Sequence, residues 1–312
     1  MKLREFRRTD GPRLFGLLKT EFPQEEAMLG MRPEGFETVV RRLFRVDARL
    51  LLGLLRGLRR SPFHLYVIED GGTIAATTLL SFTPAAGFLS TVIVAPEFRR
   101  RGFARQLLEV ARQETARRRR PYLALRVLSS NAAARTLYTS AGYGELERQR
   151  FAVHEDPSSF REGPAAGGVR PFVRADAAPL AELANRLSPE KVREVLPVRP
   201  RDLGGRTWAD RVFEAESAAW VVDRGHGPEA YVSASATPTT AAAHLGTPLV
   251  GESVEPSRAA DLVRTACSWL AARTPVRLVT TVPEDRLRAR RALEEVGFHD
   301  AIPHLTLYRP SG

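Results

Sequence analysis

The chain has 312 residues, of which 43% are hydrophobic, and a formal net charge of +11 at pH 7. This length suits two domains of ordinary size, and the hydrophobic share argues against a disordered chain. The single cysteine, Cys267, excludes an intrachain disulfide framework and a cysteine metal cluster. The six histidines have no metal-ligand spacing, so we expect no metal.

The basic excess lies in the first half. Residues 1–157 carry 27 Lys and Arg against 17 Asp and Glu, whereas residues 158–312 carry 20 against 19. Such a basic half could bind nucleic acid, an acidic substrate or a phosphate cofactor. The run Arg117–Arg120 is expected at a helix C-terminus, where cations are favourable, and no aromatic residues interleave it for base stacking. We therefore do not expect a nucleic-acid partner.

Two observations bear on the compartment. Met1 to Arg8 is charged and lacks an apolar signal core, and apolar windows such as Leu50–Leu55 are too short to span a bilayer. We expect a cytoplasmic protein without membrane contact.

Hydrophobic periodicity and turn residues predict the elements of the first half. The first predicted elements are a strand at 3–7, a helix capped by Thr9 or Asp10 and a long helical region from Pro33 to Arg60. Two strands follow at 65–69 and 73–82, joined by an Asp70-Gly71-Gly72 hairpin turn, and then a strand that ends at Val94. The last elements are a helix to about Arg119, a strand at 122–128, a helix at 132–140 and a strand at 144–154. This order predicts an α/β fold with a mixed central sheet flanked by helices.

The second half repeats the first. A Pro-, Ser- and Gly-rich stretch, 157–168, predicts a linker between domains at 1–156 and 169–312. After it, Arg174-Ala175-Asp176 aligns with Arg8-Thr9-Asp10, and Val254-Glu255-Pro256 aligns with Val94-Ala95-Pro96. We interpret these weak but ordered matches as an internal duplication.

A phosphate site is predicted where the strand through Val94 leads into a helix. Three arginines and Gly102 lie in the connecting loop, and the first amides of a helix have no partner and favour anions. The loop is neither a Walker A motif nor a Gly-x-Gly-x-x-Gly turn. Pattern alone supports a phosphate-bearing ligand, or else an ordinary turn with an arginine-rich surface.

Two segments resemble motifs of the GNAT-type N-acetyltransferases. Arg99-Arg100-Arg101-Gly102-Phe103-Ala104 is similar to the family's Arg/Gln-x-x-Gly-x-Gly/Ala loop. The segment from Asn131 to Tyr143 is similar to its Asn-x-x-Ala-x-x-Leu-Tyr-x-x-x-Gly-Phe/Tyr motif. The resemblance implies two tandem GNAT-like domains and acetyl-CoA as co-substrate. It places the cofactor at the backbone of Val92, Ile93 and Val94, at Asn131, and at Arg99, Arg100, Arg101, Gly102, Phe103, Ala104 and Arg105.

Tyr138 is the candidate general acid. It follows Asn131 by about two helical turns on the same face, so its phenol can protonate the departing CoA thiolate. The alternative is a core aromatic residue with a satisfied hydroxyl. The second half aligns Arg286 with Asn131 and Leu293 with Tyr138, has no glycine after Pro256, and puts Asp261 where phosphate would lie. We therefore expect a degenerate, non-catalytic second domain.

These motifs predict an acetyl-CoA-dependent N-acetyltransferase that acts by direct attack of a primary amine, on a small molecule or a peptide. Many family members carry a glutamate on the fourth strand, but Phe88–Val92 has no carboxylate. Glu25 and Glu26 are candidate bases; the alternatives are two solvated loop carboxylates, or a water relay from backbone carbonyls. A non-catalytic acyl-CoA-binding regulator remains the alternative function.

Overall fold

The computed structural model describes residues 1–21, 63–160, 168–204, 215–238, 240–273 and 275–312. The helical region predicted at 33–60 and the candidate bases Glu25 and Glu26 lie outside these residues.

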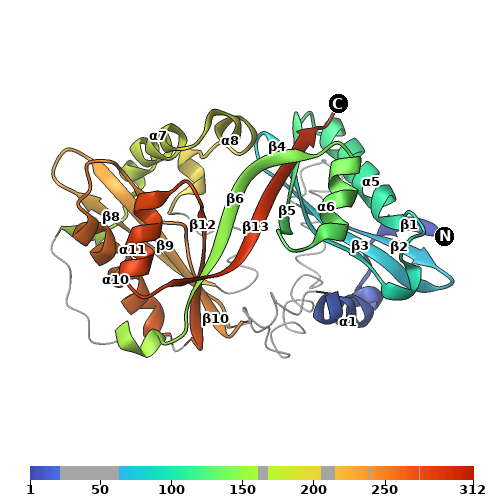
Figure 1. The fold of residues 1–312 in the computed structure, drawn as a ribbon, viewed down its shortest axis with the longest axis horizontal. Coiled ribbons are helices and arrows are strands. Elements are labelled where there is room, and N and C mark those ends of the chain that lie inside the picture. Colours follow the sequence, from blue (N-terminus) through green and yellow to red (C-terminus); the bar gives the residue numbers. More distant parts are fainter. Residues whose placement is uncertain (22–62, 161–167, 205–214, 239, 274) are drawn as a thin grey trace.

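The described strands form one sheet of 13 strands that passes through both halves of the chain (Figure 1). The strands are β1 (Lys2–Glu5), β2 (Phe63–Asp70), β3 (Thr73–Phe82), β4 (Ala86–Val94), β5 (Tyr122–Leu128), β6 (Gly144–His154), β7 (Val169–Pro171), β8 (Glu216–Asp223), β9 (Pro228–Ala236), β10 (Ala242–Leu245), β11 (Leu249–Val250), β12 (Arg277–Pro283) and β13 (His299–Pro310). Their spatial order is β1-β2-β3-β4-β5-β13-β6-β12-β10-β9-β8-β7, and β11 pairs with β9. The predicted mixed α/β fold is confirmed.

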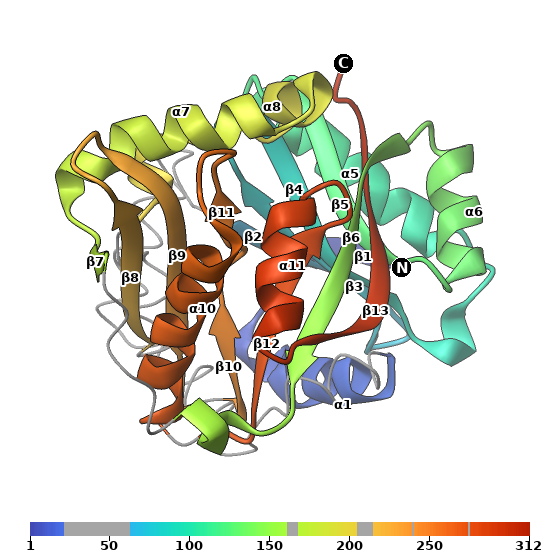
Figure 2. The same cartoon turned by 60° about the vertical axis from the view of Figure 1, so that its left-hand side comes forward.

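Helices cover both faces of this sheet (Figure 2). They are α1 (Gly11–Glu21), α5 (Phe103–Arg117), α6 (Ala132–Ser140), α7 (Ala177–Leu187), α8 (Glu190–Val195), α10 (Pro256–Ala271) and α11 (Leu287–Glu295). Short 3₁₀ turns occur at 8–10, 96–98, 157–160, 174–176 and 200–202. Apolar side chains of α5, α6, α10 and α11 pack on one face, here called the α5 face. Those of α1, α7 and α8 pack on the opposite face, here called the α1 face.

The two halves exchange their last strands. The second half's β13 lies between β5 and β6, antiparallel to both, and β6 in turn pairs with β12 of the second half. Tyr122–Leu128 of β5 is in register with Pro310–His304 of β13. Strand alternation then directs Leu305 and Leu307 to the α5 face, where they join the core of the first half.

A repeated ion pair supports the internal duplication. Arg4 donates two hydrogen bonds to Asp10, at 2.7 and 2.9 Å, and Asp10 also accepts one from the Arg7 amide at 2.6 Å. In the second half Arg170 donates two bonds to Asp176, both at 2.8 Å, and the Val173 amide donates a third at 2.8 Å. Both aspartates are buried and start the helix that follows the first strand.

Candidate functional site

Strands β4 and β5 separate halfway along β4. They pair in parallel only from Ala86–Leu89 to Tyr122–Leu125, so the following residues of β4 have no described partner strand on that side. Thr91 adopts a left-handed φ of 54°, which is uncommon outside glycine, and the β3–β4 register shifts beside it. The bulge turns β4 away from β5. The β5-facing edge of Val92–Val94 therefore has no partner strand among the described residues, although the Val94 carbonyl accepts a hydrogen bond of 3.3 Å from Arg99 Nε.

The chain then passes from β4 into α5 through a loop with unpaired amides. Gly102 is the N-cap of α5 with φ 82°, and no side chain caps the helix. None of the N–H groups of residues 100–105 donates a hydrogen bond to another described residue. A Cβ at Gly102 would meet no heavy atom within 4 Å, so the space over these amides is open. Such a helix start fits a phosphate group.

The predicted loop residues serve this site in different ways. Arg99, Arg100 and Arg101 are exposed, and Arg101 lies 5.2 Å from the centroid of the Phe98 ring. Arg105 donates to the Ser140 hydroxyl at 3.3 Å, which ties α5 to α6. The side chain of Phe103 instead packs in the core, so only its backbone is available to a ligand. Ala104 adds little bulk beside these amides.

Asn131 begins α6, as its sequence predicts. Its side-chain oxygen accepts a hydrogen bond of 3.0 Å from the Ala134 amide, which satisfies one of the free N–H groups at the helix start. The amide nitrogen of the Asn131 side chain donates to no described residue. This exposed group is the part of Asn131 that can meet a ligand.

Tyr138 lies beside the point where β4 and β5 separate. Its ring is 6% exposed and packs in a cluster with Leu125 and Val127 of β5, Val92 of β4 and Leu305 of β13. The hydroxyl makes no hydrogen bond to a described residue, and burial raises the pKa of Tyr138 to about 12. A phenol with this pKa is protonated at neutral pH and can act as a proton donor.

The second half repeats the backbone of this site with different side chains. Tyr138 and Leu293 are each the seventh residue of their helix, and equivalent backbone bonds of 3.0 Å follow them, from Tyr143 and Phe298. However, α10 begins at Pro256 directly after its N-cap, Glu255, without the loop and glycine of the first half. Leucine has no proton to donate, and the carboxylate of Glu255 lies where an anion would bind.

One detail of the predicted degeneration is wrong. Asp261 was expected at the phosphate position, but it lies in the second turn of α10, 2.8 Å from Arg264. The helix starts earlier than the sequence alignment implied, because the loop before it is absent. The acidic residue at the helix start is Glu255.

Sequence reasoning did not identify Arg126. This residue of β5 interrupts a run of apolar residues directly after Leu125, the last residue of β5 that pairs with β4. A charge in an otherwise buried strand was the available signal. Among the described residues, no cluster of three or more His, Cys, Asp or Glu side chains could hold a metal ion.

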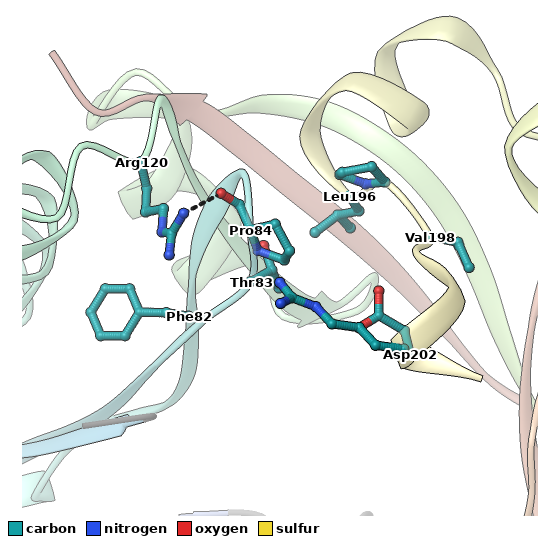
Figure 3. Close-up of a pocket in the computed structure, with 9 residues that line it drawn as sticks. Phe82, Thr83, Pro84, Arg120, Leu196, Val198 and Asp202 are labelled. Carbon is teal, nitrogen blue, oxygen red and sulfur yellow. Dashed lines mark hydrogen bonds between the residues drawn. The ribbon is translucent and has the colours of Figure 1, made fainter. Parts of the chain in front are cut away.

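A cavity of about 470 Å³ lies between the two halves, at the β3–β4 hairpin (Figure 3). Its wall combines Phe82, Thr83, Pro84 and Arg120 with Leu196, Pro197, Val198, Arg201 and Asp202. Arg120 donates to the Pro84 carbonyl at 2.6 Å, which fixes the hairpin. The cavity lies at the start of β4, whereas the open amides follow its end, so the two are separate features.

Comparison with known proteins finds a family model that is similar to part of the chain. Residues 25–143 match the sequence model of the acetyltransferase (GNAT) family. No curated protein matches the chain. None of the described helices has both the length and the apolar character to cross a membrane.

Solved structures share the fold over nearly the whole chain. A tandem GNAT protein from the clavulanic acid biosynthesis pathway is 14% identical with a TM-score of 0.63, covering 100% of this chain and 98% of that chain. A GCN5-related N-acetyltransferase from Sphaerobacter thermophilus is 16% identical with a TM-score of 0.63, covering 99% and 95%. A putative acetyltransferase from Pyrococcus horikoshii is 13% identical with a TM-score of 0.58, covering 100% and 89%.

Proposed function

We propose that this chain, in which residues 25–143 carry a domain of the GNAT acetyltransferase family, transfers the acetyl group of acetyl-CoA to a primary amine. One observation supports the proposal above the others. The open amides at the start of α5 and the phenol of Tyr138 flank the same separation of β4 from β5. A single extended thioester ligand can therefore reach both.

The residues of the first half fit acetyl-CoA. The unpaired N–H groups of residues 100–105 would hold the pyrophosphate, and Arg99–Arg101 add positive charge beside them. The edge of Val92–Val94 that lacks a partner strand would pair with the pantetheine amides, and the side-chain nitrogen of Asn131 offers one more donor. The described residues that precede α10 in the second half form no comparable loop.

In the proposed reaction the neutral amine nitrogen attacks the thioester carbonyl carbon, and the carbon–sulfur bond breaks. Tyr138 donates its proton to the sulfur that leaves, and the attacking nitrogen loses a proton to a base or to water. The apolar surroundings of Tyr138 make an unprotonated thiolate costly there, so proton donation at this point lowers the barrier. Glu25 and Glu26 remain the candidate bases.

We further propose that residues 1–156 form the catalytic unit and that residues 169–312 form a non-catalytic unit. Leu293 and Glu255, at the positions of the acid and of the phosphate loop, support this division. A non-catalytic acyl-CoA-binding protein is the second candidate, and one observation favours it. Residues 86–94 of β4 contain no carboxylate that could act as a base.

The test combines ligand binding with turnover. Calorimetric titration should detect acetyl-CoA binding to the wild-type chain, and release of free CoA thiol with a panel of amines should report transfer. Gly102→Glu should abolish binding, because it adds negative charge at the open amides. Gly72→Glu is the matched control, since Gly72 also has a left-handed φ, of 79°, and no heavy atom near its Cβ position.

The outcomes separate the candidates. Binding that Gly102→Glu abolishes, together with CoA release, is the result expected of the enzyme. Binding without CoA release for any amine would favour the non-catalytic alternative. If Gly102→Glu and Gly72→Glu bind acetyl-CoA equally well, the phosphate-site assignment is refuted.

A further inference from the structure

A row of polar side chains crosses the α1 face where the two halves meet. Thr306 of β13 is in register with Arg126 of β5 on one side and with Glu147 of β6 on the other. Side chains of directly paired residues project from the same face of a sheet. One threonine of the second half therefore lies between an arginine and a glutamate of the first half.

A second row follows on the same face. His304 of β13 is in register with Gln149 of β6, and the Gln149 amide donates a hydrogen bond to Glu147. The His304 Nδ1 donates to the Ile302 carbonyl at 3.1 Å, so the neutral ring carries its lone pair on Nε2. We call Arg126, Glu147, Gln149, His304 and Thr306 the junction cluster.

Several polar groups of the junction cluster lack partners among the described residues. Thr306 is 1% exposed and Gln149 is 9% exposed, yet the Thr306 hydroxyl and the Gln149 carbonyl oxygen make no hydrogen bond. Arg126 likewise has no described carboxylate within 4 Å and no hydrogen bond from its guanidinium, which offers five donors. Buried polar groups are normally paired, so the Thr306 and Gln149 oxygens, together with the exposed guanidinium of Arg126, indicate a place for a polar ligand.

The junction cluster adjoins the proposed reaction centre. Arg126 lies between Leu125 and Val127, whose side chains point to the α5 face and contact the cluster of Tyr138. Arg126 therefore projects to the α1 face at the point where β4 and β5 separate. A ligand bound there reaches the separation from the side opposite Tyr138.

The charges of the junction cluster select among ligands. Desolvation lowers the pKa of Arg126, although the residue is exposed. The group stays charged, since an arginine titrates far above neutral pH. Burial raises the pKa of Glu147. One arginine fork suits a carboxylate, while the nearby glutamate repels a second negative charge.

We propose that the junction cluster is the acceptor site and that Arg126 binds a carboxylate of the acceptor, which is therefore an amino-acid-like amine. This inference rests on the proposed acetyl transfer. The bound carboxylate would hold the neighbouring amine at the separation of β4 and β5. Thr306, Gln149 and His304 hydrogen-bond the rest of the acceptor.

The experiment compares acceptors that differ only in the carboxylate. Each standard L-amino acid is paired with its carboxamide, and CoA release is measured at saturating acetyl-CoA. For the preferred amino acid, kcat/KM should exceed that of its amide about 10- to 100-fold, the worth of a charge-assisted hydrogen bond. Arg126→Gln should remove this preference, and Arg126→Lys should keep part of it.

A matched control removes one arginine charge at a position outside the junction cluster. Arg148→Gln alters an exposed arginine of β6 that is in register with Leu305 and so lies on the α5 face. It should leave the preference for the carboxylate unchanged. Acetyl-CoA affinity should be equal in the wild-type chain and in all three variants, because Arg126 is not part of the phosphate loop.

Three results would overturn the inference while leaving the proposed function intact. They are equal turnover of acids and amides, an unchanged preference in Arg126→Gln, and turnover confined to amines without a carboxylate. Failure of the wild-type chain to bind acetyl-CoA would instead refute the proposed function itself. The titration and the paired acceptors therefore distinguish the two failures.

Discussion

Replacing Tyr138 by phenylalanine separates the catalytic role of this residue from a structural one. The change removes one hydroxyl and leaves the ring in its apolar cluster, so it creates no cavity of consequence. The hydroxyl makes no hydrogen bond to a described residue, so the free energy of unfolding should change by less than about 1 kcal/mol. If the phenol donates the proton, kcat should fall by about 100-fold or more.

The assay is CoA release with the preferred amine, together with chemical denaturation and acetyl-CoA titration. Tyr143→Phe is the matched control. Tyr143 is also buried, its hydroxyl also lacks a partner, and its ring centroid lies 5.8 Å from that of Tyr138. Stability and acetyl-CoA affinity should be similar in the two variants, and only Tyr138→Phe should lose turnover.

A Tyr138→Phe enzyme with the kcat of the wild type would refute the acid assignment and leave Tyr138 as a core residue. The pH dependence gives a second check. Because burial raises its pKa to about 12, Tyr138 stays protonated up to at least about pH 10. Below that pH, deprotonation of Tyr138 should not lower kcat. Any alkaline decrease in the kcat of the wild type should therefore also occur in Tyr138→Phe.

Three further predictions concern the scaffold. Asp176→Asn should lower the free energy of unfolding at pH 7 by about 2 kcal/mol, less than a fully buried pair because Arg170 keeps solvent contact. Since hydrogen bonds from Arg170 lower the pKa of Asp176, the denaturation curves of the wild type and Asp176→Asn should converge as the pH falls below about 4. A difference in the free energy of unfolding that stays the same at low pH would contradict the ion pair. Leu305→Ala should cost about 2–4 kcal/mol in denaturant and should also lower kcat, because the side chain packs beside Tyr138. Gly102→Ala should weaken acetyl-CoA binding less than Gly102→Glu in titration, because it adds backbone strain without charge.

The local elements around the site could be predicted from sequence. Strand β5 and helix α6 have the predicted bounds, because β5 is a short, largely apolar run and Asn131 is a strong helix cap. The motif residues at the start of α5 were also predictable, since Gly102 is needed for a left-handed N-cap. The local conformation of each of these segments is determined by a few adjacent residues.

The order of strands could not be predicted in the same way. The alternation along β13 directs Leu305 and Leu307 to one face whichever half the strand joins, so the pattern does not choose between β5 and β12 as its neighbour. The junction cluster was hidden for the same reason. Arg126 and His304 are far apart in the chain, and only the exchange of β13 brings them to one face.

The exchanged strand explains how a half that we propose to be non-catalytic can be essential to the other half. Through Leu305, β13 supports the apolar surroundings of Tyr138 on the α5 face, and through His304 and Thr306 it contributes to the junction cluster on the α1 face. A chain cut at residue 156 would leave the facing edges of β5 and β6 without the strand that pairs with both. Loss of the phosphate loop from the second half is thus compatible with a structural need for its last strand, and with a direct part for that strand in the proposed acceptor site.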